Sequence, residues 1–455
     1  MRSQLFACAL LIVPALLHAQ EDVPSQLSLL DIARAHIDIA LESRADSQLW
    51  GRIAGSAAER KSAQTLAAQL KPYVDRAWTE EFTFEAPRPK SWRLELQAAG
   101  LLESAMPAPF DALFPQQIPP TAIVHIDPDR EGGWKEARGK WAFVAATMEL
   151  SPSRTSVRKQ LLYQRAVEAG ALGFVFSIPT PPGRWQAVVP IDKPYALQDV
   201  RYRDHVRPIP CFCIDSDDGK RLQQAIADGQ RLKAAITFSK TRVHPALNAV
   251  AQLDSSSDRT ILLMAHLDSF FTGANDDASG MAALVGVAQR LSQIPQNRRK
   301  ARFLFASMSA HHDEAAGMRA FLARDEKRTA SIGEFILLEH VDARVGDLAG
   351  KTDWPQPLNN RRAAFVGPDG WPELENGLGE LVQSTGLMTQ PPAIRRACIA
   401  DLFVVCDSAK TFCLMQGPPY YHTTHDTLDK ISEQGIADAV EFHIQLLARI
   451  GAIEL

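Results

Sequence analysis

The sequence predicts an α/β fold: a mixed, mainly parallel central sheet flanked by helices, with a second, β-rich domain inserted into it. Two regions with different patterns support this prediction. From residue 248 onward, apolar strands alternate with loops and helices, as in a buried parallel sheet. Before that point, residues 121–238 form a strand-rich section. The 455 residues accommodate two or three domains of roughly 150 residues each.

The chain begins with the pattern of an export signal. Arg2 supplies a positive charge, residues 5–17 form an apolar run, and the small residue Ala19 follows. This order is typical of a secretory signal peptide, which we place at residues 1–19. The apolar run is shorter than the roughly 20 residues that a membrane-spanning helix needs. We therefore expect a secreted or periplasmic protein with no stable membrane anchor once the signal is removed.

The first half of the mature chain contains helices, a proline-rich zone and then strands. Residues 27–70 have helical spacing, and Ser56 is a suitable N-cap for a second helix within this segment. Prolines are dense between residues 87 and 120, where they favour edge strands, loops or a domain crossing. Beyond this zone we expect strands at 122–126, 140–146, 172–176 and 209–214, and helices at 158–169 and 219–227.

The second half alternates between strands and helices. We expect apolar strands at residues 260–265, 302–308 and 334–338, and a helix at 278–291. The resulting division comprises the signal at 1–19, the N-terminal part of the main domain at 20–95, the inserted domain at 96–242 and the rest of the main domain at 243–455.

Charge and cysteine content restrict the function and the compartment. The chain has 49 Lys and Arg against 53 Asp and Glu, a net charge of −4, which argues against a nucleic-acid partner. Once Cys8 is removed with the signal, five cysteines remain, so at least one is unpaired within the chain. Cys398, Cys406 and Cys413 are close enough in sequence for a short-loop disulfide in an oxidising compartment.

Metal-ligating side chains follow each strand of the second half. His266 and Asp268 end the first strand, and the loop at 273–280 contains Asp276. The next two strands are followed by further histidines and carboxylates, and a fourth cluster lies in a loop, at His311, His312, Glu339, Tyr421 and His422. In open α/β sheets, ligands bind beyond the carboxyl ends of the strands, so these clusters can share one crevice.

The residue types favour zinc or a similar divalent metal. Two neighbouring metal ions need a bridging carboxylate, and Asp276 is suited to this role because its loop is bounded by glycines. Asp268, two residues after His266, is placed to accept a hydrogen bond that fixes the His266 imidazole.

Taken in order, these motifs resemble those of the secreted co-catalytic zinc aminopeptidases, metallopeptidase family twenty-eight. The sequence has His-x-Asp at 266–268, Gly-Ala-x-Asp-x-Ala-Ser-Gly at 273–280 and Tyr-His-Thr-x-x-Asp-Thr at 421–427. Residues 140–144, 163–176 and 209–214 resemble a protease-associated domain, which is frequently inserted in that family.

The resemblance implies a zinc exopeptidase-like fold, a peptide substrate and two zinc ions per chain, with a single ion or another divalent metal as the alternative. It implies a cis peptide bond after Asp276 and an oxyanion-donor role for Tyr421. By the same resemblance, metal site one uses His266, Asp276 and Glu339, and metal site two uses Asp276, His312 and His422.

One motif departs from the family pattern. Where the family has Glu-Glu, this chain has His311 and His312. His312 can replace the second Glu as a metal ligand. The first Glu is normally the general base, and a neutral His311 can accept a proton in its place. An imidazolium beside two dications is repelled, however, so Asp313 and Glu314 are alternative bases.

These features predict an exported metal-dependent exopeptidase, an aminopeptidase that hydrolyses peptide bonds through a metal-activated water. The His-His pair motivates an alternative, a metal- or peptide-binding homologue with weak or lost hydrolysis. A further alternative is glutaminyl cyclase-like or carboxypeptidase chemistry on the same fold. The sequence leaves the oligomeric state and side-chain preference open.

Overall fold

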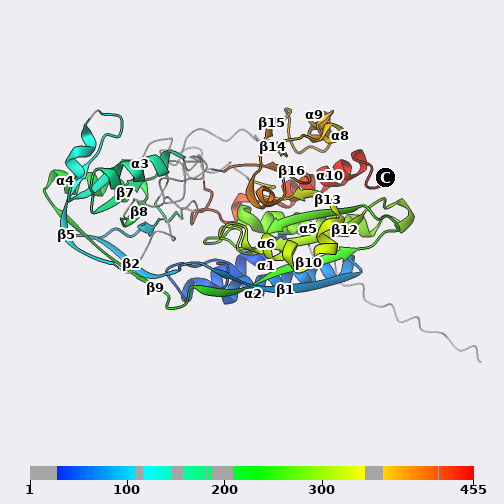
Figure 1. The fold of residues 1–455 in the computed structure, drawn as a ribbon, viewed down its shortest axis with the longest axis horizontal. Coiled ribbons are helices and arrows are strands. Elements are labelled where there is room, and N and C mark those ends of the chain that lie inside the picture. Colours follow the sequence, from blue (N-terminus) through cyan, green and yellow to red (C-terminus); the bar gives the residue numbers. More distant parts are fainter. Residues whose placement is uncertain are drawn as a thin grey trace, which may run out of the picture.

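The chain forms two bodies, each built on an eight-stranded sheet, and an antiparallel ribbon joins them (Figure 1). The predicted signal peptide at 1–19 lies outside the described residues. The computed structural model describes residues 28–108, 116–130, 132–145, 157–180, 182–185, 209–343, 362–418 and 420–455.

The first sheet has four parallel strands at its centre and antiparallel neighbours on both sides, as the predicted mixed, mainly parallel sheet requires. The parallel strands β12, β11, β13 and β16 lie side by side in that order. In spatial order, the strands are β1 (Arg76–Glu85), β10 (Val243–Leu253), β12 (Arg302–Met308), β11 (Thr260–His266), β13 (Ile332–Leu337), β16 (Lys410–Met415), β14 (Ala363–Val366) and β15 (Ala393–Arg396).

Strand β11 is buried along its whole length, as its nearly continuous apolar run predicts. Its side chains alternate between two cores. Ile261 and Leu263 pack in the core shared with the helices α1 (Leu29–Glu42), α2 (Ala57–Leu70), α5 (Ser279–Ser292) and α10 (Glu433–Arg449). Leu262 and Met264 pack in the core on the other face, together with residues of α6 (Ala316–Arg324). The sheet is therefore covered on both faces.

The helix boundaries follow local capping chemistry. The Ser56 hydroxyl accepts a hydrogen bond from the backbone N–H of Glu59 and begins α2, as predicted. Ser28 caps α1 in the same way. Three further helices described in this body are short: α7 (Glu326–Ser331), α8 (Pro372–Glu375) and α9 (Leu378–Ser384).

The second sheet belongs to the inserted section, and its order is β3-β2-β9-β5-β6-β7-β8-β4. Strands β5, β6, β7 and β8 run parallel to one another, and the outer strands are antiparallel to their neighbours. Its elements are β2 (Pro89–Leu96), β3 (Gly100–Leu101), β4 (Met106–Pro107), β5 (Gln116–His125), β6 (Trp141–Val144), α3 (Val157–Glu168), β7 (Gly173–Ser177), β8 (Cys211–Ile214), α4 (Ser216–Ala227) and β9 (Arg231–Phe238).

The strand pairing corrects the predicted domain boundary at residues 95 and 96. Strand β2 lies before this boundary for nearly all its length, yet it pairs with β9 in the second sheet. The chain therefore crosses between Glu85 and Pro89, and it returns between Phe238 and Val243. The proline-rich zone suggested a crossing but did not locate it, because the strand that follows begins on a proline itself.

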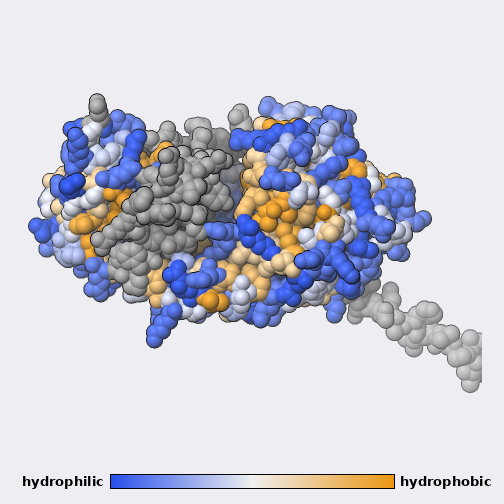
Figure 2. Space-filling model, in the orientation of Figure 1, coloured by the Kyte–Doolittle hydropathy of each residue, from blue (hydrophilic) through white to orange (hydrophobic). Residues whose placement is uncertain are grey.

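The surface is largely hydrophilic. On the face drawn in Figure 2, hydrophilic residues predominate on both bodies, and each body also has smaller apolar patches. Within the described ranges, no helix has the length and apolar character that crossing a bilayer demands.

We expect Gly173→Ala to destabilise the second body. A Cβ atom at Gly173 would collide with the buried ring of Trp141, its partner on the neighbouring strand. Overpacking of this kind costs about 1–3 kcal/mol of unfolding free energy. Gly333→Ala is the matched control, because nothing lies near the added atom. Thermal and urea unfolding measure both variants, and equal unfolding midpoints would contradict the packing argument.

Candidate metal centre

The four parallel strands bring the predicted clusters to one edge of the first sheet. His266 is the last residue of β11, and His311 and His312 follow β12. Glu339 follows β13, and His422 follows β16. Because the carboxyl ends of parallel strands meet at the same edge, residues far apart in the sequence lie together here.

Asp276 lies at the centre of this group. Its Oδ1 is 2.9 Å from Nε2 of His266 and 2.9 Å from Nε2 of His340, and its Oδ2 is 3.0 Å from Nε2 of His422. The Nε2 atoms of His422 and His312 are 3.1 Å apart. One carboxylate, almost fully buried, is thus in contact with imidazoles that follow three different strands.

The surroundings set the protonation of Asp276. Burial alone would raise the pKa of its carboxyl group. The electrostatic effect of His422 and hydrogen bonds from His266, His340 and His422 outweigh burial and hold this pKa well below its ordinary value. The carboxylate is therefore an acceptor and an anion at any moderate pH.

The donor set has the composition of a zinc site. Two groups each place one ligand atom per residue within 4.8 Å of the others: His266, Glu339 and His340, and Asp276, His312 and His422. Two buried ligand atoms lack a hydrogen-bonding partner within the described part of the chain: Glu339 Oε2 and His422 Nδ1. Imidazole nitrogens and carboxylate oxygens that converge in this way suit Zn²⁺ and similar divalent ions.

Asp268 holds two of the imidazoles, in a way that differs from the prediction. Its backbone carbonyl, rather than its carboxylate, accepts a hydrogen bond from Nδ1 of His266 at 2.9 Å. The carboxylate accepts from Nδ1 of His312 at 2.8 Å and from the backbone N–H of His311 at 2.9 Å. The side chain points toward β12 because the segment after that strand supplies these donors. In both imidazoles Nδ1 is engaged in a hydrogen bond to Asp268, so Nε2 is the nitrogen that can bind a metal ion.

The loop that carries Asp276 is fixed by other buried groups. The Asp426 carboxylate accepts hydrogen bonds from the backbone N–H groups of Asn275 at 2.8 Å and of Asp276 at 3.0 Å. The Asp277 carboxylate accepts from the backbone N–H groups of His266 and His340, each at 3.2 Å. Asp277 therefore connects the ends of β11 and β13. The peptide bond between Asp276 and Asp277 is cis, as the resemblance implied.

Arg52 supports the same loop from within the body. It is fully buried, and its guanidinium donates to the backbone carbonyls of Leu267, Thr272 and Gly273 at 3.0–3.2 Å. These carbonyls precede Asp276 on the loop. Burial lowers the pKa of Arg52 to about 10, while Asp276 and the neighbouring carboxylates raise it, so the group stays charged at neutral pH.

His311 lies against this centre and faces a carboxylate. Its ring stacks on that of His266, with ring centroids 4.2 Å apart and an interplanar angle of 11°. Its Nδ1 is 3.1 Å from Oδ2 of Asp401. One of its ring nitrogens belongs to a further group with His266 and His312, with ligand atoms within 4.8 Å.

The structure separates the two alternative bases from His311. The Asp313 carboxylate forms a paired contact with the guanidinium of Arg88 at 2.6 and 2.9 Å, which engages both of its oxygens. Glu314 is exposed. Of the three residues considered as bases, His311 is therefore the one that lies beside the imidazoles.

The aromatic ring of Tyr421 lies beside the centre. The ring stacks on His422 with centroids 3.4 Å apart, and its centroid lies 5.1 Å from that of His340. This position is compatible with the proposed role as an oxyanion donor.

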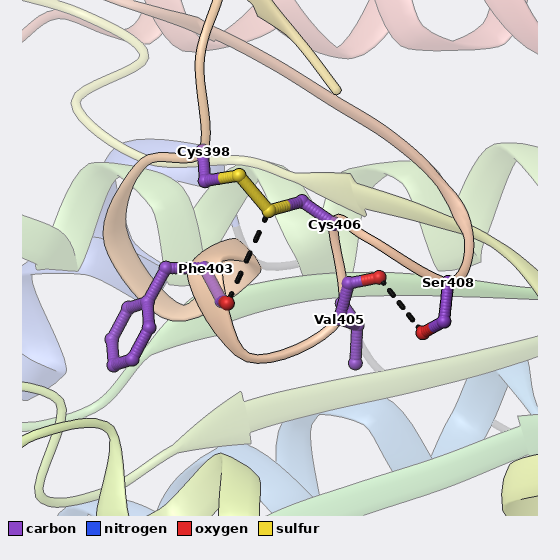
Figure 3. The surroundings of a disulfide bond; sticks show 5 residues. All are labelled: Cys398, Phe403, Val405, Cys406 and Ser408. Atoms are coloured by element: carbon purple, nitrogen blue, oxygen red, sulfur yellow. Dashed lines mark hydrogen bonds between the residues drawn. A yellow bond between two sulfur atoms is a disulfide. The ribbon is translucent and has the colours of Figure 1, made fainter. Parts of the chain in front are cut away.

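The sequence did not assign two residues that the structure places in this group. His340 was visible beside Glu339, but no role was given to it, although its Nε2 contacts Asp276. Asp401 had no sequence signal of its own. It lies in the turn Ala400–Val404, inside the loop that the Cys398–Cys406 disulfide closes (Figure 3). That disulfide selects one of the pairings left open, and Cys413 is a buried thiol.

The buried carboxylate and imidazole cluster at the carboxyl edge of the mixed sheet has donors of the kind that hold divalent metal ions. Residues 248–353 match the model of peptidase family M28, the family that the motifs resemble.

Solved structures share the fold over nearly the whole chain. A peptidase M28 precursor from Shewanella amazonensis is 16% identical, covers 94% of this chain and 95% of its own, and has a TM-score of 0.62. A zinc aminopeptidase from Bacillus subtilis is 17% identical over 92% of this chain and 95% of its own, with a TM-score of 0.61. An aminopeptidase from Aneurinibacillus sp. strain AM-1 is 18% identical over 90% and 93%, with a TM-score of 0.53. No curated protein matches the chain.

We expect Arg52→Lys to weaken the metal centre. A lysine retains the charge but cannot donate to several carbonyls in the fork geometry of arginine. Leaving these buried carbonyls unsatisfied costs about 1–3 kcal/mol of unfolding free energy, and the Asp276 loop loses its support. Arg93→Lys is the matched control, because that side chain is 66% exposed. Urea unfolding and a zinc titration measure the two effects, and wild-type values for Arg52→Lys would refute this role.

Proposed function

We propose that this protein is an exported zinc aminopeptidase that removes residues from the amino end of peptides. The observation that supports it most is the buried Asp276 carboxylate, in contact with imidazoles that follow three strands. The family match and the fold support a metal-dependent peptidase. Export rests on the pattern of residues 1–19, and we propose the second body as the protease-associated domain.

In this proposal Asp276, His266 and Glu339, with His340 next to them, would hold one zinc ion. Asp276, His312 and His422 would hold a second. When bound, zinc supplies Lewis-acid polarisation of the scissile carbonyl and makes a water acidic enough to react at neutral pH. A single ion or another divalent metal remains the alternative.

The residues of the chain then have separate tasks. His311 accepts a proton from the attacking water at its ring nitrogen Nε2. Asp268 holds His312 through its carboxylate and His266 through its carbonyl, so that both present Nε2 to the centre. The Tyr421 hydroxyl donates to the oxygen that becomes negative in the tetrahedral intermediate.

The second body contacts the loop that carries His422 and therefore lies next to the site. Trp185 and Thr423 form an isolated antiparallel bridge, and the backbone N–H of Thr424 donates to the carbonyl of Arg184 at 2.9 Å. A cavity of about 1040 Å³ lies at this junction and is lined by residues of both bodies, including Trp50, Arg184 and Thr424. We propose that this junction shapes peptide access.

A second candidate function follows from the His-His pair alone. If His311 does not support proton transfer, the protein binds metal or peptide with little hydrolysis. The two functions predict the same metal content and different turnover.

We expect purified wild-type protein to contain zinc and to hydrolyse aminoacyl chromogenic substrates. Asp276→Asn should lose the metal, because the bridging carboxylate loses an anionic oxygen. His311→Ala should keep the metal and lose about 10²–10⁴-fold in kcat, as expected for removal of a general base. Elemental analysis and steady-state kinetics measure these effects, with the exposed His125 as the site of the control His125→Ala.

The outcomes separate the candidate functions. Absence of zinc, cobalt and manganese after metal supplementation rules out the metal centre. Bound metal without hydrolysis of any aminoacyl substrate supports the binding homologue. Mass spectrometry of a test peptide shows whether the residue leaves from the amino or the carboxyl end, or whether a cyclised amino terminus forms.

A further inference from the structure

We infer that the second body positions a metal ligand of the first body. Its segment 182–185 holds the loop 420–427, and through that loop it fixes the place of His422. Gly183 and Thr424 are the positioning residues at this contact. The inference rests on the proposed zinc centre, and it gives the second body a role beyond peptide access.

The loop 420–427 contributes to the centre at two points. It carries His422, whose Nε2 is 3.0 Å from Oδ2 of Asp276. Four residues later, the Asp426 carboxylate accepts hydrogen bonds from the backbone N–H groups of Asn275 and Asp276. A displacement of this loop therefore moves a ligand and also removes the support of the Asp276 carboxylate.

The backbone at His422 depends on its neighbours. Its φ of 58° lies in the left-handed region, which residues with a side chain rarely adopt and which persists only where the surrounding structure enforces it. Within the loop, the backbone N–H and the hydroxyl of Thr423 both donate to the carbonyl of Tyr420, at 3.0 and 2.6 Å. These bonds close a tight turn around His422. They do not fix the turn relative to the sheet, so contacts from outside the loop are needed.

The segment 182–185 supplies such contacts through its backbone. Trp185 and Thr423 form an antiparallel bridge. The backbone N–H of Thr424 donates to the carbonyl of Arg184 at 2.9 Å, and the backbone N–H of Arg184 donates to Oγ1 of Thr424 at 3.2 Å. Reciprocal bonds of this kind define the position of one chain against the other more closely than contacts between long side chains do.

The same segment is anchored in the second body. The backbone N–H of Gly183 donates to the Asp215 carboxylate at 2.8 Å, and this carboxylate also caps α4 by accepting from the backbone N–H of Asp218 at 2.8 Å. Trp185 is buried in the core of the second body, and its carbonyl accepts from Sγ of Cys213 at 3.0 Å. The loop of His422 is therefore connected to a helix terminus and to a hydrophobic core of the second body.

Close approach at Gly183 makes the contact sensitive to a single atom. A Cβ atom at this position would lie 2.5 Å from Oγ1 of Thr424 and 2.9 Å from Nε2 of His425. The two backbones can approach in this way because glycine has no side chain. Any larger residue must push the loop 420–427 away from the segment.

The first test compares Gly183→Ala with Gly173→Ala. Gly183→Ala should lower the zinc affinity about 10–100-fold, as expected when the support of a metal ligand is disturbed. Gly173→Ala overpacks the core of the second body against Trp141, so it should lower the unfolding midpoint yet change the zinc affinity less than about twofold. Competition with a chelator measures zinc affinity, and thermal unfolding measures stability in the same samples.

The second test reverses the sign of one substitution. Thr424→Ala alone should lower the zinc affinity about fivefold, because the backbone N–H of Arg184 loses its acceptor. Thr424→Ser keeps the hydroxyl and should bind zinc as the wild type does. Added to Gly183→Ala, however, Thr424→Ala should raise the zinc affinity, since it removes the atom that the new Cβ meets.

Every outcome bears on the inference. Opposite signs of Thr424→Ala in the two backgrounds, with wild-type zinc affinity in Gly173→Ala, support it. The same sign in both, wild-type zinc affinity in Gly183→Ala, or an equal loss in Gly173→Ala overturns it while the proposed function stands. If Gly183→Ala does not fold, Thr424→Ala alone decides, and unchanged zinc affinity there overturns the inference. A wild-type protein that binds no metal overturns the proposed function, and the inference with it.

Discussion

The structure depends on one constraint, the burial of an ionised carboxylate at Asp276. A charge in this position is tolerated only if cations or strong donors surround it on every side. Imidazoles of His266, His340 and His422 supply part of that environment, and the metal proposed at this site would supply the rest. The loop must also be held in place, which is what Asp426 and Arg52 do. These buried polar groups of the first body therefore all stabilise the position or the charge of the Asp276 carboxylate.

The parallel order of the central strands makes this arrangement possible. Neighbouring parallel strands point their carboxyl ends the same way, so four short segments deliver side chains to one edge of the sheet. The Asp277 carboxylate connects these strands further, because it accepts hydrogen bonds from backbone N–H groups at the ends of β11 and β13. Burial raises the pKa of Asp277 to about 7 against the opposing effect of His266, because the side chain is fully enclosed.

Much of this could be read from the sequence because the signals were local. The apolar run of β11 and the Gly-bounded loop of Asp276 each determine their own conformation, and the predicted mixed α/β fold was confirmed. The ribbon of β1 and β2 was missed, since its strands pair with residues more than a hundred positions away and carry prolines at the junction. Asp401 was missed for the same kind of reason, because its contact with His311 depends on a loop that folds back onto the segment after β12.

The His-His pair shows how distant segments meet at the edge of the first sheet. The segment after β12 supplies the imidazoles of His311 and His312 there. A buried carboxylate reaches the same place from another part of the chain, because Asp401 lies in a disulfide-closed loop more than eighty residues later and its Oδ2 is 3.1 Å from Nδ1 of His311. A motif that departs from the family pattern along the sequence therefore has to be judged with its neighbours in space, since a carboxylate absent from the motif is present beside it.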